Sequence, residues 1–170
     1  LEPALTLLAG AERPLILAGG GGWNDAGKDS LCQFAEASDV PVAAIFRYHD
    51  VMNNHSPAYI GDAGVGMAVH IRKAIMESDV ILCVNGRFGE ATTGAWELLS
   101  VPHPRQKIIH SHASDAEIGK IYHPDIAFHA GPNEMATALK EAGLSRGKQA
   151  KRKGWGTSLR KAYEAAIKAP

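Results

Sequence analysis

Residues 78–94 read Ser-Asp-Val-Ile-Leu-Cys-Val-Asn-Gly-Arg-Phe-Gly-Glu-Ala-Thr-Thr-Gly, and this stretch decides the fold. An apolar run of strand length, residues 80–84, leads directly into a glycine-rich loop that carries Arg87. Open α/β sheets bind their ligands in the crevice at the carboxyl ends of such buried strands. The stretch therefore predicts a central strand with a binding crevice at its end, and Arg87 is the anion-binding candidate there.

Strands alternate with helices on both sides of this segment. Apolar runs predict further strands over residues 14–18, 40–46, 107–112 and 126–130, and helical spacing predicts helices over 25–38, 65–77 and 132–142. Such alternation is typical of a mainly parallel sheet with helices on both faces. The predicted fold class is α/β, a three-layer Rossmann-like fold.

Two stretches are expected to lack regular structure. Residues 47–66, rich in His, Asn, Pro and Gly, predict a long functional or interfacial loop. Residues 145–157 hold five basic residues and three glycines and predict an exposed linker, followed by a helix over 158–168. The predicted organisation is one domain over 1–143, then a basic linker and helix over 144–170 that leads to a further domain outside the chain.

The composition narrows the function classes. With 18 basic and 18 acidic residues the net charge is zero, which favours neither nucleic acid nor an anionic membrane as a partner. No apolar run approaches the roughly 20 residues that a bilayer requires, and no signal peptide is evident, so a cytoplasmic protein is expected. Cys32 and Cys83 lie in a predicted helix and strand and are expected to be free, buried thiols.

The glycine run after the first strand has two interpretations. No frame through it supplies the glycine spacing of the dinucleotide fingerprint. Gly19, Gly20 and Gly21 can nevertheless bring backbone amides close to a phosphate near a helix N-terminus, and the alternative is a tight turn without a ligand. The next strand ends in Phe46-Arg47 rather than in an acidic residue, which disfavours NAD and leaves an NADP-type site open.

The remaining polar residues do not form a catalytic motif. His110 and His112 lie two apart on a predicted strand and share a face, but no third metal ligand is spaced to join them, so core or crevice-rim histidines are expected. No serine or cysteine nucleophile is paired with a histidine. Arg87 has a plain alternative role in an ion pair with Glu90 or Asp62. The sequence thus predicts no catalytic and no metal-ligating residue.

From about Pro3 to Gly143 the chain resembles the central domain of thiamine-diphosphate-dependent enzymes of the acetolactate synthase and benzoylformate decarboxylase type. The resemblance rests on separate pieces in the right order: Arg13-Pro14, Gly19 to Gly21, Val40-Pro41-Val42, Gly61 and Gly64, Asp79 to Leu82, Arg87-Phe88, Thr93-Gly94 and Ala116 to Lys120. It implies a six-stranded Rossmann-like sheet between two thiamine-binding domains. In some members this domain holds FAD or an adenine nucleotide outside the chemistry, and in others it is empty.

Carried over residue by residue, the resemblance implies FAD contacts at Gly19 to Gly21, Ile45 and Phe46, Ile60 and Gly61, and Arg87. Five positions depart from the flavin-binding pattern: Asn85 replaces a glycine, Gly89 an aspartate, Ala91 an arginine, Ala63 a histidine, and His112 an acidic residue. Because each lost charge-assisted hydrogen bond is worth roughly 1.5–3 kcal/mol, these changes weigh against a retained flavin. Gly61-Asp-Ala-Gly64 also lacks the family's Gly-Asp-Gly, so thiamine diphosphate and Mg²⁺ would be bound elsewhere in the parent enzyme.

The leading expectation is therefore a non-catalytic central domain of a thiamine-diphosphate enzyme, a decarboxylase and carboligase (lyase or transferase) acting on 2-keto acids. Its partners would be the N- and C-terminal thiamine-binding domains of the same chain, in a homodimer or homotetramer, and the isolated domain would be inactive. The alternatives are a free-standing module that binds FAD, ADP or NADP, and a purely structural spacer.

Overall fold

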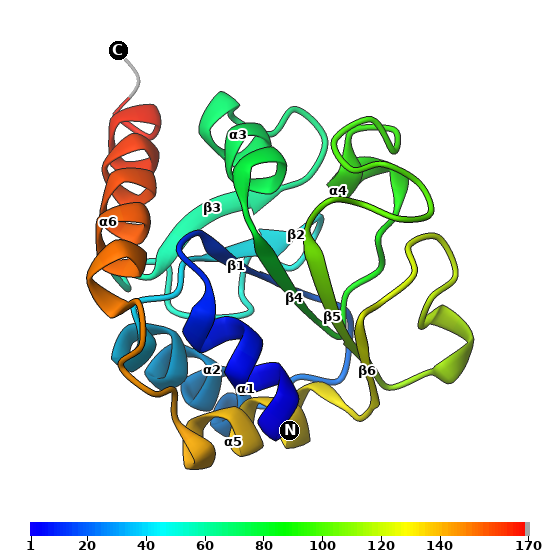
Figure 1. The fold of residues 1–170 in the computed structure, drawn as a ribbon. Coiled ribbons are helices and arrows are strands. Elements are labelled where there is room, and N and C mark those ends of the chain that lie inside the picture. The colour runs from blue at the N-terminus through cyan, green and yellow to red at the C-terminus, as the bar shows by residue number, and fades with distance from the viewer. Residues whose placement is uncertain (169–170) are drawn as a thin grey trace.

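A six-stranded, all-parallel sheet forms the centre of the computed structural model, which describes residues 1–168 (Figure 1). The strands lie in the order β3-β2-β1-β4-β5-β6. They span Pro14–Ala18 (β1), Val42–Ile45 (β2), Tyr59–Ala63 (β3), Val80–Val84 (β4), Lys107–His112 (β5) and Ile126–His129 (β6). The order reverses between β1 and β4, and such a switch point is where a sheet of this kind opens a crevice.

Helices cover both faces of the sheet, as the α/β prediction requires. One face carries α1 (Glu2–Gly10), α2 (Asp25–Ser38) and α5 (Pro132–Ala142). The other carries α3 (Val69–Glu77), the short α4 (Glu90–Thr93), the 3₁₀ helix Asp115–Glu117 and much of α6 (Gln149–Ala166). The predicted three-layer Rossmann-like fold is confirmed.

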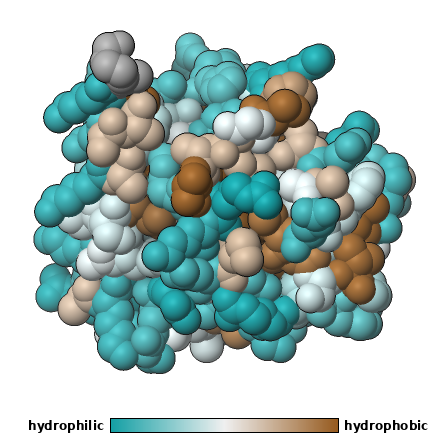
Figure 2. Space-filling view, turned by 90° about the horizontal axis from the view of Figure 1, so that it is seen from above, coloured by the Kyte–Doolittle hydropathy of each residue, from teal (hydrophilic) through white to brown (hydrophobic). Residues whose placement is uncertain are grey.

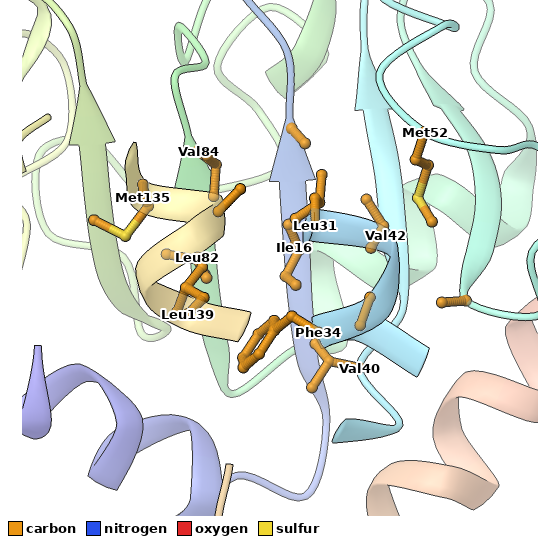
Figure 3. Packing of buried hydrophobic residues seen from close by; sticks show 14 of the residues in the cluster. Ile16, Leu31, Phe34, Val40, Val42, Met52, Leu82, Val84, Met135 and Leu139 are labelled. Atoms are coloured by element: carbon orange, nitrogen blue, oxygen red, sulfur yellow. The ribbon is translucent and has the colours of Figure 1, made fainter. Parts of the chain in front are cut away.

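The two central strands are apolar throughout because neither face of them meets water. All five residues of β1 and all five of β4 are buried. Figure 3 shows Phe34 of α2 and Leu139 of α5 packed beside Ile16 and Leu82 of these strands. Removing a buried phenylalanine or leucine costs about 2–5 kcal/mol, so this layer fixes α2 and α5 over the sheet.

Local signals set the ends of α2. The Asn24 side chain accepts a hydrogen bond from the Gly27 amide at 2.8 Å and caps the first turn. The helix ends where Asp39 adopts a left-handed conformation with φ of 52°. Helix α5 begins with a proline at its first position and ends before Gly143.

Strand β3 lies inside the stretch that was predicted to be a long loop. The prediction for 47–66 was wrong at this point, because Gly61 and Asp62 interrupt the apolar pattern that marks a strand. Helix α3 also begins at Val69 rather than at 65, and Val65 and Val69 are 74% and 81% exposed. The apolar side predicted for residues 65–77 is therefore buried only from Ile71 onward.

The predicted linker over 145–157 was wrong as well. Helix α6 begins at Gln149 and packs back on its own domain, against β3 and α3. Arg152 is only 1% exposed and donates hydrogen bonds to Ala9 O at 2.9 Å and Ser38 O at 3.2 Å. The basic composition of residues 145–157 suggested that they are exposed to solvent. The guanidinium of Arg152 is instead buried and binds α6 to α1 and α2 through hydrogen bonds.

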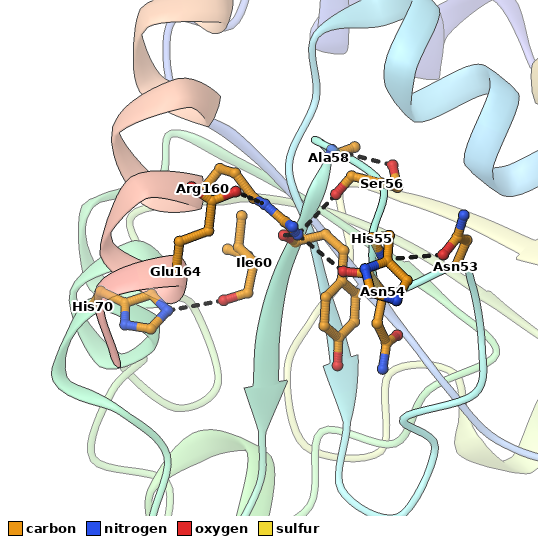
Figure 4. A network of polar contacts seen from close by, with 10 residues as sticks. Asn53, Asn54, His55, Ser56, Ala58, Ile60, His70, Arg160 and Glu164 are labelled. Carbon is orange, nitrogen blue, oxygen red and sulfur yellow. Dashed lines mark hydrogen bonds and ion pairs between the residues drawn. The ribbon is translucent and has the colours of Figure 1, made fainter. Parts of the chain in front are cut away.

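The outer edge of β3 is irregular and is bound by side chains (Figure 4). The pairing of β2 with β3 shifts between Val42 and Ala43, whose partners are Tyr59 and Gly61. Arg160 of α6 donates to Tyr59 O at 2.8 Å, and Nε2 of His70 in α3 lies 2.8 Å from Ile60 O. Two helices thus bind two backbone carbonyl groups of β3.

Candidate functional site

The main cleft lies at the carboxyl ends of β1, β2, β4 and β5, on both sides of the switch point. Its volume is about 650 Å³, within the roughly 300–1,000 Å³ typical of small-molecule sites. Its lining consists of Gly20, Gly21, Ile45, Phe46, Tyr48, Asn85, Arg87, Gly89, Glu90, Ala91, Thr92, His112, Ala113 and Ser114. The glycine loop, the end of β2 and the loops after β4 and β5 therefore meet in one hollow.

Asn85 holds three of these loops together. Its Nδ2 donates to Gly21 O at 2.8 Å and to Gly19 O at 3.3 Å, and its Oδ1 accepts from the Ala113 amide at 3.2 Å. Asn85 itself adopts a positive φ of 54°, which asparagine tolerates better than most residues. Asn85, one of the five residues that depart from the flavin-binding pattern, thus joins the loops at the switch point by hydrogen bonds.

Close packing explains why the loop needs glycine at one position in particular. Gly20 has a φ of +72°, and a Cβ there would lie 2.0 Å from the backbone oxygen of Asn85. A Cβ on Gly21 would meet no atom within 4 Å. Gly20 is required by the approach of the two loops, whereas Gly21 leaves its space open at the cleft.

Arg87 forms an ion pair that the sequence did not indicate. Its guanidinium lies 3.4 Å from the Glu117 carboxylate, rather than pairing with Glu90 or Asp62, and its side chain is 72% exposed. Lys120 binds the same carboxylate at 3.2 Å. Two cations therefore share one anion at the rim of the cleft.

The structure brings four of the six predicted cofactor-binding residues to the cleft: Gly20, Gly21, Phe46 and Arg87. Gly19 lies beneath it, where a Cβ would be 2.7 Å from Cβ of Ile45. Gly61 lies away from it, and a Cβ there would be 3.1 Å from the Tyr163 ring of α6. Whether any of these residues binds a cofactor stays a prediction.

A second hollow adjoins the main cleft at the N-terminus of α2, where the glycine run was predicted to bring backbone amides close to a phosphate. It has a volume of about 270 Å³ and includes Gly20, Gly21 and Tyr48, which also line the main cleft, together with Lys28 and Arg47. Lys28 is paired with Asp50 at 2.7 Å. Asp50 also lines the hollow and offsets the charge of Lys28, so Arg47, the glycine loop and the helix N-terminus are what make the site suited to phosphate. The glycine run and Arg47 at the end of the next strand were the signals in the sequence, whereas Lys28 was not singled out there.

Both cysteines of the chain have raised thiol pKa values. Burial raises the pKa of Cys83 to about 12, so it is a neutral thiol at pH 7, and burial also raises the pKa of Cys32. Within residues 1–168, three or more His, Cys, Asp or Glu side chains do not gather into a metal-binding cluster. Gly61 to Ala63 form the end of β3. The described residues therefore do not fit thiamine diphosphate with Mg²⁺.

Comparison with known proteins agrees with this fold. The family model described as "Thiamine pyrophosphate enzyme, central domain" matches residues 1–139. An acetolactate synthase large subunit from Parasynechococcus marenigrum is 27% identical over 152 residues, which is 89% of this chain and 24% of that protein. A probable acetolactate synthase large subunit from Methanocaldococcus jannaschii is 32% identical over 126 residues, 74% of this chain and 21% of that protein. Acetolactate synthase isozyme 2 large subunit from Escherichia coli is 26% identical over 141 residues, 83% of this chain and 25% of that protein.

The fold and the cleft define a Rossmann-like domain of the kind found inside larger enzymes. The chain belongs to the family of thiamine pyrophosphate enzyme central domains. It spans about a quarter of the length of the curated relatives that it matches, 24% of the first. Among the described residues, no helix combines the length and apolar character that crossing a membrane requires.

Proposed function

We propose that this chain is the central domain of a thiamine-diphosphate and Mg²⁺-dependent enzyme that decarboxylates a 2-keto acid and transfers the acyl group, as the likeness to acetolactate synthases implies. The match of the family model over residues 1–139 carries this proposal. Thiamine diphosphate would be bound by the N- and C-terminal domains of the same polypeptide, and two or four copies would form the enzyme. The central domain contributes no catalytic group.

Exposed apolar side chains support a position between other domains. Seen from above, apolar side chains reach the surface at several places among polar ones (Figure 2). The exposed large apolar residues include Val65, Val69, Met76 and Val101. Exposed apolar side chains that form a large patch commonly mark a surface that contacts another protein or domain. The thiamine-binding domains would cover this surface.

The main cleft supports a second role for the domain, the binding of an adenine nucleotide. The amides of Gly20 and Gly21, with Lys28 and Arg47 at the N-terminus of α2, suit a diphosphate, and Arg87 suits a further anionic group. A complete flavin is less well served, because Gly89, Ala91 and His112 supply neither the arginine nor the two acids of the flavin-binding pattern. We therefore propose ADP or a related nucleotide as the occupant.

Activity of the parent enzyme is tested by measuring acetolactate formation from pyruvate with the full-length polypeptide, with and without thiamine diphosphate and Mg²⁺. The proposal expects product only when both are present and none from the 170-residue chain alone. Absence of decarboxylation with every 2-keto acid tried would contradict it.

Nucleotide binding is tested separately by calorimetric titration of the chain with ADP, FAD and NADP. We expect ADP to bind, and Arg87→Ala to weaken binding about tenfold, the equivalent of 1.4 kcal/mol. Arg146→Ala, which removes an exposed arginine far from the cleft in sequence, is the matched control and should leave binding unchanged. If none of the three nucleotides binds, the domain is a spacer and the nucleotide role is wrong.

A further inference from the structure

Side chains bind the carbonyl groups of the glycine loop, residues 19–22, and its amides are left unpaired. Three carbonyl oxygens of the loop each accept a hydrogen bond from a side chain: Gly19 O from Nε1 of Trp23 at 2.8 Å, Gly21 O from Nδ2 of Asn85 at 2.8 Å, and Gly22 O from Nδ2 of Asn133 at 2.8 Å. Within residues 1–168, the backbone amides of Gly20, Gly21 and Gly22 donate to no other protein group. The loop therefore presents unpaired donors while most of its acceptors are occupied, an arrangement that suits an anion.

The residues that carry these amides line the two adjoining hollows. Gly20 and Gly21 line both the main cleft and the second hollow, and Gly22 lines the second hollow. Gly21 and Gly22 are exposed, so a ligand in either hollow reaches the loop. Phosphate oxygens accept several hydrogen bonds at once and therefore fit a row of backbone donors.

Asn133 reaches the loop from the first turn of α5, 111 residues away from Gly22 in the chain. Its Nδ2 binds the Gly22 carbonyl, and its Oδ1 accepts from the Asn24 amide at 2.9 Å. One carboxamide thus joins the end of the glycine loop to the residue that caps α2. Asn133 lines neither hollow, so its effect on a ligand is transmitted through the loop.

The position of Asn133 explains a glycine inside α2. A Cβ on Gly27 would lie 2.1 Å from Oδ1 of Asn133. Glycine in a helix costs about 1 kcal/mol relative to alanine, so α2 is weakened at the one place where the carboxamide approaches it. Gly20 stands in the same relation to Asn85, because a Cβ there would lie 2.6 Å from Nδ2 of Asn85. Each carboxamide therefore has a glycine that makes room for it.

We propose that Asn85 and Asn133 are positioning residues that hold the amides of the glycine loop toward a phosphate group, so that the cleft selects phosphorylated over unphosphorylated nucleosides. The inference rests on the proposed binding of an adenine nucleotide and names the group that the loop recognises. Asn133 gives the cleaner test, because Asn85 also lines the main cleft and its removal would change the cleft wall as well.

The first test compares the affinities of the chain for ADP and adenosine, which differ only in the diphosphate, by calorimetry and, for weak binding, by NMR titration. In Asn133→Ala we expect ADP to bind about tenfold more weakly, the equivalent of about 1.4 kcal/mol, and adenosine to keep its affinity within about twofold. A variant that merely loosened the fold would weaken both ligands. The ratio of the two affinities therefore isolates the contribution of the loop.

Gln106→Ala is the matched control. The buried Gln106 carboxamide also donates to backbone carbonyls, Ile75 O at 3.2 Å and Met76 O at 2.9 Å. It directly precedes β5, at the opposite end of that strand from the cleft. Gln106→Ala should lower the stability of the domain and leave both affinities unchanged.

Gly27→Ala tests the same contact from the other side. The new Cβ would displace the Asn133 carboxamide without removing it, so ADP should bind as weakly as in Asn133→Ala. The two changes act on one contact, so the double variant should bind ADP no more weakly than either single variant. Losses that add in the double variant would contradict a shared mechanism.

Labelling the glycines with ¹⁵N shows whether the amides are used. Added ADP or inorganic pyrophosphate should move the amide resonances of Gly20, Gly21 and Gly22 more than adenosine does, and Asn133→Ala should reduce that movement. ADP binding that leaves these resonances unmoved would overturn the inference, as would an equal loss of ADP affinity in Asn133→Ala and Gln106→Ala. Both of these results would leave the nucleotide role standing. If neither ADP nor pyrophosphate binds, the nucleotide role fails and this inference fails with it, so the two failures are distinguishable.

Discussion

Replacing Arg152 by methionine should destabilise the domain by about 3 kcal/mol. Its guanidinium donates to four carbonyl oxygens, of Ala9 at 2.9 Å, Ser38 and Ser145 at 3.2 Å, and Arg146 at 3.4 Å. Methionine keeps most of the aliphatic stem but supplies no donor, so the buried Ser38 carbonyl would lose this hydrogen bond and the half-buried Ala9 carbonyl would keep only the Lys148 amide at 3.2 Å.

The magnitude follows from these contacts. A hydrogen bond to a charged group contributes roughly 1.5–3 kcal/mol, so the two bonds to Ala9 and Ser38 together account for about 3–6 kcal/mol. Burial disfavours the charged guanidinium, which lowers its pKa, and the loss of that cost offsets part of the effect. Water can reach the carbonyls of the exposed Ser145 and Arg146, so their loss adds little. A net loss near 3 kcal/mol is the result.

The assay is urea unfolding followed by far-ultraviolet circular dichroism, with the midpoint and the slope compared between variants. Arg146→Ala is the matched control, because it removes an exposed arginine from the same segment and should change the free energy of unfolding by less than about 0.5 kcal/mol. A loss below about 1 kcal/mol for Arg152→Met, or a loss equal to that of Arg146→Ala, would refute the view that this guanidinium joins α6 to the domain.

Two further predictions follow from the glycine loop and the buried histidine. Gly20→Ala should lower the free energy of unfolding by at least about 2 kcal/mol, because a φ of +72° is strained for alanine and the new Cβ would lie 2.0 Å from the Asn85 backbone oxygen. Gly21→Ala should be tolerated, because its Cβ would meet no atom within 4 Å. Urea unfolding of the two variants measures the difference, and equal losses of stability would contradict the prediction. Because burial lowers the pKa of His110, which is 2% exposed, below its unfolded value of about 6.5, the unfolded chain binds more protons, so stability should fall as the pH drops from 7 to 5. His110→Gln should lose part of this pH dependence, measured by urea unfolding at both pH values, and an unchanged slope would count against this expectation.

The central part of the fold could be predicted because its strands are buried on both faces. Val80–Val84 and Pro14–Ala18 are continuous apolar runs, and this pattern survives in the sequence without knowledge of any partner. Strand β3 lacks this pattern, since Gly61 and Asp62 follow only two apolar residues. Its place at the edge of the sheet, beside α6, is set by tertiary contacts rather than by local preference.

The burial of Arg152 was the second feature that the composition of its segment did not predict. Arg152 lies in a basic stretch, and its carbonyl partner on Ser38 is 114 residues away in the chain. The same limit applies to the candidate site. Gly20 and Arg87 could be chosen because each follows a predicted strand, and Phe46 because it ends one and matches a position that the family resemblance implies. The pairing of Arg87 with Glu117 and the bridge from Asn85 to Ala113 depend on how the loops meet, and short-range sequence patterns carry no record of that.

The side chains that bind backbone carbonyls of β3 also bear on whether this edge can pair with a strand of another molecule. An open sheet ends in a row of backbone groups that can pair with a strand from a neighbouring molecule, which is a common route to aggregation. Arg160 and His70 contact the carbonyl oxygens of Tyr59 and Ile60, so these two groups are already occupied. Helix α6 therefore hinders the pairing of β3 with a strand of another molecule. A shortened domain that ends before Arg160 would leave the Tyr59 carbonyl unpaired and would be expected to aggregate more readily, even with its core intact.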